Sequence, residues 1–390
     1  MTGWRPAVIV LVVALLGAAA VVSVPEYFLV QAPAARQQYP KYQGVRLVRD
    51  DFDRGNFADR GMFLREGTRP YVDRYSEYPQ LGTYLFALPY LFVSTYDGHK
   101  VFFTFLMAVA LGGIAASMTR LCVRLGVSPY RVLLLLLPGT LYFSLNRFDA
   151  APTALVMAAL ALLLGGRVAV AHGVLAAAFL TKAYPLLYVP LFSRVAWDAG
   201  GGKGLLRAWA AFAGTIAVCT AQIAAWVGFR PLLGPYLFFG NRLDNTQSLF
   251  HVVAQALPAA GETPARAVFR VMQAGLGLAG AAASRLSAHD VVRWMAIMTI
   301  AFVVFTRFQS PQWVLWITPP ALLAARDRTE LGLVVAQDVL TYAYFPLAYD
   351  RFGPVAPALA FVVGALCAIR LVLLACLLRP DAVRGAQALA

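Results

Sequence analysis

Acidic and basic side chains alternate in one polar stretch near the amino end of the chain, residues 46–80. Its acids include Asp50, Asp51, Asp53, Asp59, Asp73 and Glu77, and its arginines include Arg49, Arg54, Arg60, Arg65, Arg69 and Arg74. A carboxylate can take the proton from an attacking hydroxyl, and arginine or lysine can neutralise a departing phosphate. We therefore predict that this stretch forms the active-site loop and that its chemistry is transfer of a group from a phosphate.

Further polar side chains stand at the ends of apolar runs. They are Arg147, Asp149, Lys182, Arg307 and Gln309. A charge beside a membrane segment is costly unless it pairs or faces water, so such residues are candidates for a functional site. Each could instead snorkel to the interface or form an ion pair. Together with Asp53 and Glu77 they could line one cavity, which we expect to bind the substrates.

The composition restricts the class of protein. The chain has 390 residues, of which 60% are hydrophobic and 13% charged, and a formal net charge of +14. A water-soluble fold could not bury so much apolar surface, so we expect a membrane protein. Much of the excess positive charge lies in short loops between apolar runs, which is typical of cytoplasmic loops and not of nucleic-acid binding. The four cysteines are isolated, and they indicate neither a metal site nor a disulfide framework.

Apolar runs and loop charges predict about twelve membrane spans in a single all-α domain, 1–390. The expected spans are 7–24, 101–119, 132–146, 150–166, 168–181, 184–197, 209–229, 268–283, 291–306, 312–324, 331–349 and 357–378. Segment 81–95 is apolar but shorter than the roughly twenty residues that a spanning helix needs. If it does not cross, 25–100 is one large extracytoplasmic loop with helices near the membrane, and the basic loops all fall in the cytoplasm.

Several short motifs occur in a fixed order along residues 51–320. They are Asp53 with Phe57, GTRPY at 67–71, EYP at 77–79, RFD at 147–149, KAYP at 182–185 and SPQW at 310–313. Each is weak alone, but in this order and spacing the chain resembles the GT-C membrane glycosyltransferases. The resemblance is greatest to glycosyltransferase family 87, the bacterial enzymes that depend on polyprenyl-phosphate mannose.

The resemblance implies an inverting transferase that needs no metal or other cofactor. It would move a sugar from a polyprenyl phosphosugar to a glycolipid or polysaccharide acceptor, on the outer face of the bacterial cytoplasmic membrane. Mannose is the sugar that the family implies, and arabinofuranose is the main alternative. Oligomeric state and any partner subunit are left open.

In the family the catalytic base is an acid in the first outer loop. That motif falls on Asp53, with Asp51 and Asp59 as alternatives, because the acids crowd together and Phe57 stands where the family usually has Tyr. Lys182 and Arg147 would hold the donor phosphate.

The remaining candidates have two readings each. Glu77 is a ligand of the acceptor or a partner of a loop arginine. His251 could place the phosphate or carry a proton, although a lone histidine is more often a bystander. For Asp51 and Asp59 the alternative to catalysis is helix capping or an ion pair.

Other functions would fit parts of the pattern. A secondary transporter would also have about twelve spans, but its polar residues belong near mid-membrane. An outer-face polysaccharide ligase would use the same kind of donor, but its large catalytic loop would come late in the chain. A purely structural membrane protein would have no use for the acidic stretch.

Overall fold

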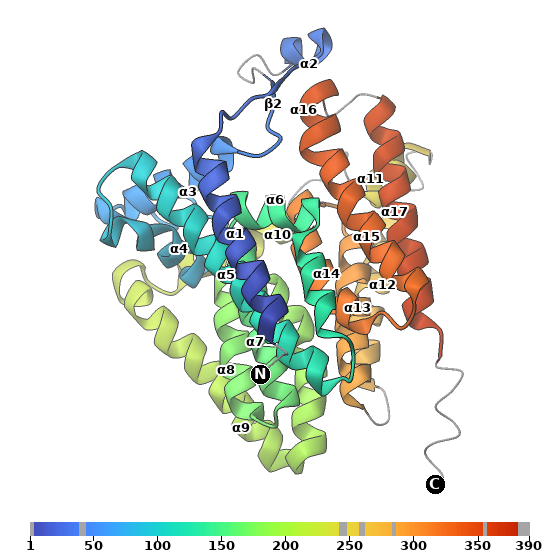
Figure 1. Cartoon of the computed structure of the whole chain (residues 1–390). Coiled ribbons are helices and arrows are strands. Elements are labelled where there is room, and N and C mark those ends of the chain that lie inside the picture. The colour runs from blue at the N-terminus through green and yellow to red at the C-terminus, as the bar shows by residue number, and fades with distance from the viewer. Residues whose placement is uncertain are drawn as a thin grey trace.

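The computed structural model describes residues 4–38, 44–241, 248–256, 262–282, 286–353 and 357–380. The fold is all-α apart from one antiparallel pairing of two-residue strands, β1 (Leu29–Val30) with β2 (Gly44–Val45). The helices pack into one bundle (Figure 1).

The α-helices are α1 (Arg5–Ser23), α2 (Pro33–Gln38), α3 (Asp51–Arg65), α4 (Gln80–Ala87), α5 (Tyr96–Arg124), α6 (Pro138–Asn146), α7 (Ala150–Leu164), α8 (Val168–Thr181), α9 (Val189–Val227), α10 (Gly234–Asn241), α11 (Leu249–Ala256), α12 (Glu262–Ala282), α13 (Ala288–Val304), α14 (Val314–Ala324), α15 (Arg328–Tyr342), α16 (Tyr349–Phe352) and α17 (Pro357–Leu378). Short 3₁₀ helices are η2 (Leu88–Leu91), η3 (Pro129–Leu136), η4 (Tyr184–Tyr188), η5 (Arg230–Leu233) and η7 (Pro311–Trp313), and η8 (Ala343–Ala348) is a π-helix.

Five of the described helical segments are long and apolar enough to cross a membrane, or six if the pair α6 and α7, bent by 112°, counts as one. The chain is therefore an all-α protein with membrane-spanning helices, but the expected number of twelve spans is not confirmed. Several of the expected spans are divided into short pieces. The run 132–146, for example, is split between η3 and α6 at Pro138, because proline has no backbone N–H to continue a helix.

The longest apolar segment, Tyr184–Val227, is broken near its middle. Gly200 and Gly201 leave the helical conformation there, and Gly201 has a φ of +57°, which glycine adopts without steric cost. After the break the chain leads away in a different direction (Figure 1). The two runs expected at 184–197 and 209–229 lie on either side of this break.

Segment 81–95 contains only α4 and η2. Together these short helices are well below the roughly twenty residues that a membrane-spanning helix needs. The polar segment between α1 and α5 thus contains α2, which lies beside α16 (Figure 1), and α3, which packs against α4 and α6. Among the described residues, segment 81–95 contains no helix long enough to be a candidate span by itself.

Contacts between side chains distinguish the two ends of the bundle. At the start of α1, the ring of Trp4 lies 5.2 Å from the guanidinium of Arg120, near the end of α5. At the other end of α1, Arg49 donates a hydrogen bond of 3.2 Å to the carbonyl oxygen of Val24. Helices α1 and α5 are therefore antiparallel, and α3 begins at the end of the bundle opposite to Trp4.

Basic loop residues gather at the end of the bundle that carries Trp4. Arg131 donates to the carbonyl oxygen of Ala325 at 2.7 Å, and Arg326 donates to that of Arg379 at 2.9 Å. The loops after α5, after α14 and after α17 are thus adjacent. Arg120 belongs to the same end through its contact with Trp4.

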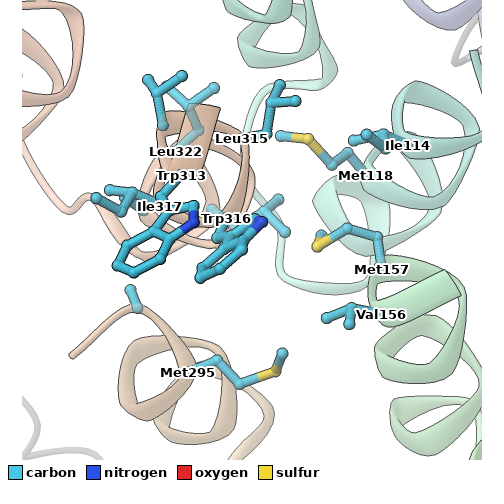
Figure 2. Close-up of a cluster of buried hydrophobic side chains, with 14 of the residues drawn as sticks. Ile114, Met118, Val156, Met157, Met295, Trp313, Leu315, Trp316, Ile317 and Leu322 are labelled. Atoms are coloured by element: carbon cyan, nitrogen blue, oxygen red, sulfur yellow. The ribbon is translucent and has the colours of Figure 1, made fainter. Parts of the chain in front are cut away.

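The core near the site consists of large apolar side chains from α5, α7, α13 and α14. Met118, Met157 and Met295 are fully buried beside the stacked indoles of Trp313 and Trp316, whose ring centroids are 4.7 Å apart (Figure 2). Because such a cluster resists rearrangement, it fixes α14 against α7.

Helix α3 packs closely on the last turn of α4. A Cβ atom added at Gly61 would lie 2.1 Å from the carbonyl oxygen of Phe86, a distance that requires the backbone to move. We expect Gly61→Ala to destabilise the protein by about 1–3 kcal/mol, as overpacking does, and to lower its melting temperature in detergent. Gly214→Ala in α9 is the matched control, since no atom lies within 4 Å of the added Cβ. Equal melting temperatures for the two variants would contradict this packing.

Candidate functional site

The acidic run determines where α3 begins. Asp50 is its N-cap, and its Oδ1 accepts a hydrogen bond of 3.2 Å from the backbone N–H of Phe52. Asp51 and Asp53 lie in the first turn, where negative charge is favoured by the exposed N–H groups and the helix dipole. The same residues that stabilise the start of the helix therefore place three carboxylates within its first turn.

Two arginines join these acids to distant parts of the chain. Arg46 contacts Asp350 of α16 at 2.6 Å and Asp50 at 3.0 Å. Arg147, between α6 and α7, contacts Asp50 at 2.7 Å through one guanidinium nitrogen and Asp53 at 2.6 Å through the other. We call the five residues Asp350, Arg46, Asp50, Arg147 and Asp53 the charge chain, because negative and positive groups alternate along it.

Solvent reaches the charge chain at Asp53. The side chain of Asp50 is 0% exposed and that of Asp53 is 27% exposed. Burial disfavours ionisation of Asp50, but Arg147 and Arg46 outweigh it and hold its pKa below the usual range. At Asp53 desolvation by the surrounding protein is the largest effect and, with the charge of Asp50, it raises the pKa despite the opposing charge of Arg147. A carboxylate with a raised pKa is a better proton acceptor.

The end of α6 holds the start of α3 in place. The side-chain oxygen of Asn146 accepts from the backbone N–H of Asp50 at 2.9 Å, and its amide donates to the carbonyl oxygen of Val48 at 2.9 Å. The other end of α6 is fixed by the buried Asp338 of α15, which accepts from the backbone N–H of Gly139 at 2.8 Å. Arg147 follows α6 directly, so its position depends on both anchors.

A second buried ion pair lies two residues further along. Asp149 is 0% exposed, and its Oδ1 accepts from Lys182 Nζ at 2.6 Å and from the indole N–H of Trp316 at 2.9 Å. Lys182 Nζ also lies 4.6 Å from the ring centroid of Phe148. Within the part of the chain that the structure describes, Asp149 Oδ2 is buried and accepts no hydrogen bond. These contacts bring Lys182, at the end of α8, to the same helix junction as Arg147.

Tyr78 lies between the two ion-pair clusters. Its ring packs edge-on against Phe148 at 4.9 Å. Burial raises the pKa of Tyr78 well above its ordinary value, and the charges of Glu77, Asp53 and Asp149 raise it further. Tyr78 therefore packs against the residue that stands between Arg147 of the first cluster and Asp149 of the second.

The two other acids proposed as the base have different surroundings. Asp51 pairs with Arg49 and Arg54, and Lys100 lies 3.8 Å away. These contacts agree with the alternative role of Asp51, an ion pair with neighbouring arginines. Asp59 lines a polar cleft beside α3.

The remaining predicted residues are less closely connected to these clusters. Arg307 and Gln309 lie in the connection before η7, and Trp316, which contacts Asp149, lies in the following helix, α14. Gln309 is buried and Arg307 half-buried. His251 lies on α11, which packs against α12 and α17 and is separated laterally from α3 (Figure 1). We therefore omit His251 from the candidate site.

An apolar groove of about 610 Å³ runs between α4, α5, α7 and α8. It extends to Thr181, the residue before Lys182, and to Ala151, two residues after Asp149. Gly82 permits this arrangement, because its Cα faces the carbonyl oxygen of Thr181 so closely that an added Cβ would lie 2.6 Å from it. The groove therefore ends next to the second ion pair.

Sequence reasoning missed two members of the site. Asp350 stands at the end of an apolar run, the same signal that pointed to Arg147, and Asn146 precedes Arg147 directly. Arg46 and Asp50 belonged to the polar stretch but had received no role. Within the described ranges, no three His, Cys, Asp or Glu side chains gather closely enough to hold a metal ion.

No protein-family model matches this sequence, and a search of curated proteins found no significant match. The site must therefore be interpreted from its own geometry and from the motifs in the sequence.

The charge chain should contribute strongly to stability. Removing one partner of a buried ion pair leaves the other charge uncompensated, which costs about 3–5 kcal/mol. We expect Asp350→Ala, which leaves the buried Arg46 with one fewer carboxylate, to lower the melting temperature of the purified protein in detergent. Asp73→Ala is the control, since Asp73 pairs with Arg69 on the surface and its loss should change nothing measurable. If Asp350→Ala and Asp73→Ala have the same melting temperature, the charge chain does not hold α16 to the start of α3.

Proposed function

We propose that this protein is an inverting membrane glycosyltransferase that uses a polyprenyl phosphosugar. The observation that carries the proposal is the proximity of three features at one end of the bundle. These are the solvent-accessible carboxylate of Asp53, the buried cation of Lys182 and an apolar groove that ends beside Lys182. A base, a phosphate ligand and a lipid-binding surface are what such a reaction needs.

In the proposed reaction, the hydroxyl oxygen of the acceptor attacks the anomeric carbon of the donor sugar while Asp53 takes its proton. The bond between the anomeric carbon and the phosphate oxygen breaks, and its electron pair remains on the polyprenyl phosphate. Attack from the face opposite the phosphate inverts the anomeric centre. The raised pKa of Asp53 favours its role as the base.

Two cations have separate tasks in this proposal. Lys182 contacts the donor phosphate, which competes with Asp149 for the ammonium group. The compact positive charge of lysine suits a phosphate. Arg147 is occupied by Asp50 and Asp53, so its first task is to orient the base, and the donor phosphate could approach the same guanidinium. The polyprenyl chain lies in the groove between α4, α5, α7 and α8.

The proposed membrane orientation follows from the two ends of the bundle. Arginines of short loops lie in the cytoplasm by the positive-inside rule, so the end with Arg120, Arg131 and Arg326 is cytoplasmic and the end with α3 is extracytoplasmic. The chain would cross about twelve times, with several crossings built from two short helices. The membrane is then the bacterial cytoplasmic membrane, the donor sugar is mannose or, as the alternative, arabinofuranose, and the acceptor is a glycolipid or a polysaccharide.

A secondary transporter is the second candidate, because Asp338 on α15 and Arg370 on α17 are buried inside candidate spans. Asp338, however, caps the start of α6, because its carboxylate accepts hydrogen bonds from the backbone N–H groups of Gly139 and Thr140. This role explains a buried acid without transport. Assaying the purified protein against a panel of polyprenyl phosphosugars, with the products identified by mass, separates the two functions.

The base can be identified by substitution. We expect Asp53→Asn to lower kcat by at least about 100-fold, within the range typical of general-base catalysis, while donor binding is kept. Asp51→Asn and Asp59→Asn test the rival acids, and Asp73→Asn is a surface control. If Asp53→Asn leaves turnover intact, the base is another acid. If none of the three loop variants reduces turnover, the proposed mechanism is wrong.

The pH profile gives an independent test of Asp53. A base works only when ionised, so activity should fall as the pH is lowered through its pKa, and a raised pKa places this fall above the ordinary value of about 3.9. Arg147→Gln removes the positive charge that opposes the rise, so the fall should move to higher pH, whereas Arg147→Lys should move it less. Measuring kcat/KM from acidic to neutral pH checks this. A profile identical in all three proteins would show that Arg147 does not act on the base.

A further inference from the structure

A polar cleft lies beside α3, on the side of the connection 66–79. Its volume is about 280 Å³, close to the lower end of small-molecule sites. The side chains that give it its character are Asn56, Asp59, Arg60, Phe63, Arg74 and Tyr75. The mixture of carboxylate, amide, guanidinium and aromatic groups contrasts with the apolar lining of the groove between α4, α5, α7 and α8.

The cleft is connected to the candidate base through Asn56, which lines the cleft. Asn56 follows Asp53 by one helical turn, and its amide nitrogen lies 3.3 Å from Asp53 Oδ1. Arg60 and Phe63 continue the same face of α3, because residues three or four apart lie above one another on a helix. A molecule in the cleft would therefore contact Asn56, the hydrogen-bond partner of Asp53, and Arg74 on another part of the wall.

The lining groups suit sugar hydroxyls. Asp59 accepts hydrogen bonds, Asn56 both donates and accepts, and Arg74 donates. The guanidinium of Arg74 lies 4.0 Å from the ring centroid of Phe63, so that its donors are held in place by stacking. The aromatic rings can cover the apolar face of a sugar. A lipid chain, in contrast, would leave these polar groups without partners, which is costly.

We infer that this cleft binds the sugar of the acceptor, so that the acceptor is a glycan recognised by its sugar units and not by a lipid tail. The inference rests on the proposed function. The attacking hydroxyl belongs to the sugar in the cleft and gives its proton to Asp53. The anomeric carbon of the donor gains the new bond to that oxygen, and polyprenyl phosphate leaves with the electron pair of the broken bond.

The test uses the full chain in lipid nanodiscs with radiolabelled polyprenyl-phosphate mannose or arabinofuranose as the donor. Two acceptor probes are compared, a water-soluble methyl mannobioside and a diacylglycerol-linked mannoside. We expect the soluble glycoside to be an acceptor. Arg74→Ala should raise its KM at least tenfold, with the KM of the donor and kcat at saturating acceptor within twofold of the wild-type values.

Arg69→Ala is the matched control, because Arg69 is exposed on the same connection, pairs with Asp73 and does not line the cleft. It should leave both KM values unchanged. Transfer to the lipid-linked probe alone, or an unchanged acceptor KM in Arg74→Ala, would overturn the inference and leave the proposed function standing. Absence of transfer from either donor to either probe would overturn both.

Discussion

The charge chain is the interaction on which the site depends. Charged groups are costly to bury, and they persist in a low-dielectric interior only when each one has a partner of opposite sign. Here Arg46 and Arg147 each form ion pairs with two carboxylates, and Asp50 pairs with both arginines. The series links α16, the segment before α3 and the junction of α6 with α7. Because it ends at Asp53, where solvent enters, one carboxylate is held in a fixed position with a raised pKa.

The rest of the architecture keeps these charges together. Asn146 ties the end of α6 to the backbone of Asp50, and Asp338 fixes the beginning of α6. The second ion pair, Asp149 with Lys182, lies against the rings of Phe148 and Trp316, and Phe148 directly follows Arg147 of the first cluster. The two clusters therefore form one polar region at the end of an otherwise apolar bundle. Short helices such as α4 and α6 suit this end, since they place several chain reversals next to one another.

Much of this could be predicted from the sequence, and the failures have physical reasons. The membrane class followed from composition, and the cost of charges at helix junctions pointed to Arg147, Asp149 and Lys182, which the structure joins to one another or to Asp53. The same signal marks Asp350, but its partner could not be predicted, because the pairing with Arg46 spans 304 residues and depends on how α16 folds back. The number of spans could not be predicted from the sequence either, since apolar runs of similar length can fold as one long helix or as short pieces separated by prolines.

The polar cleft and the apolar groove approach the same polar region from different sides of α3 and α4. This arrangement suits a reaction between a water-soluble partner and a lipid-linked one, with Asp53 and Lys182 acting on the two reactants. The most direct measurement is a cryo-EM structure of the protein in nanodiscs with polyprenyl phosphate and a bound antibody fragment. The phosphate should lie against Lys182, with the chain in the groove between α4, α5, α7 and α8. Phosphate density at the end of the bundle that carries Arg120 and Arg326 would contradict the shared site.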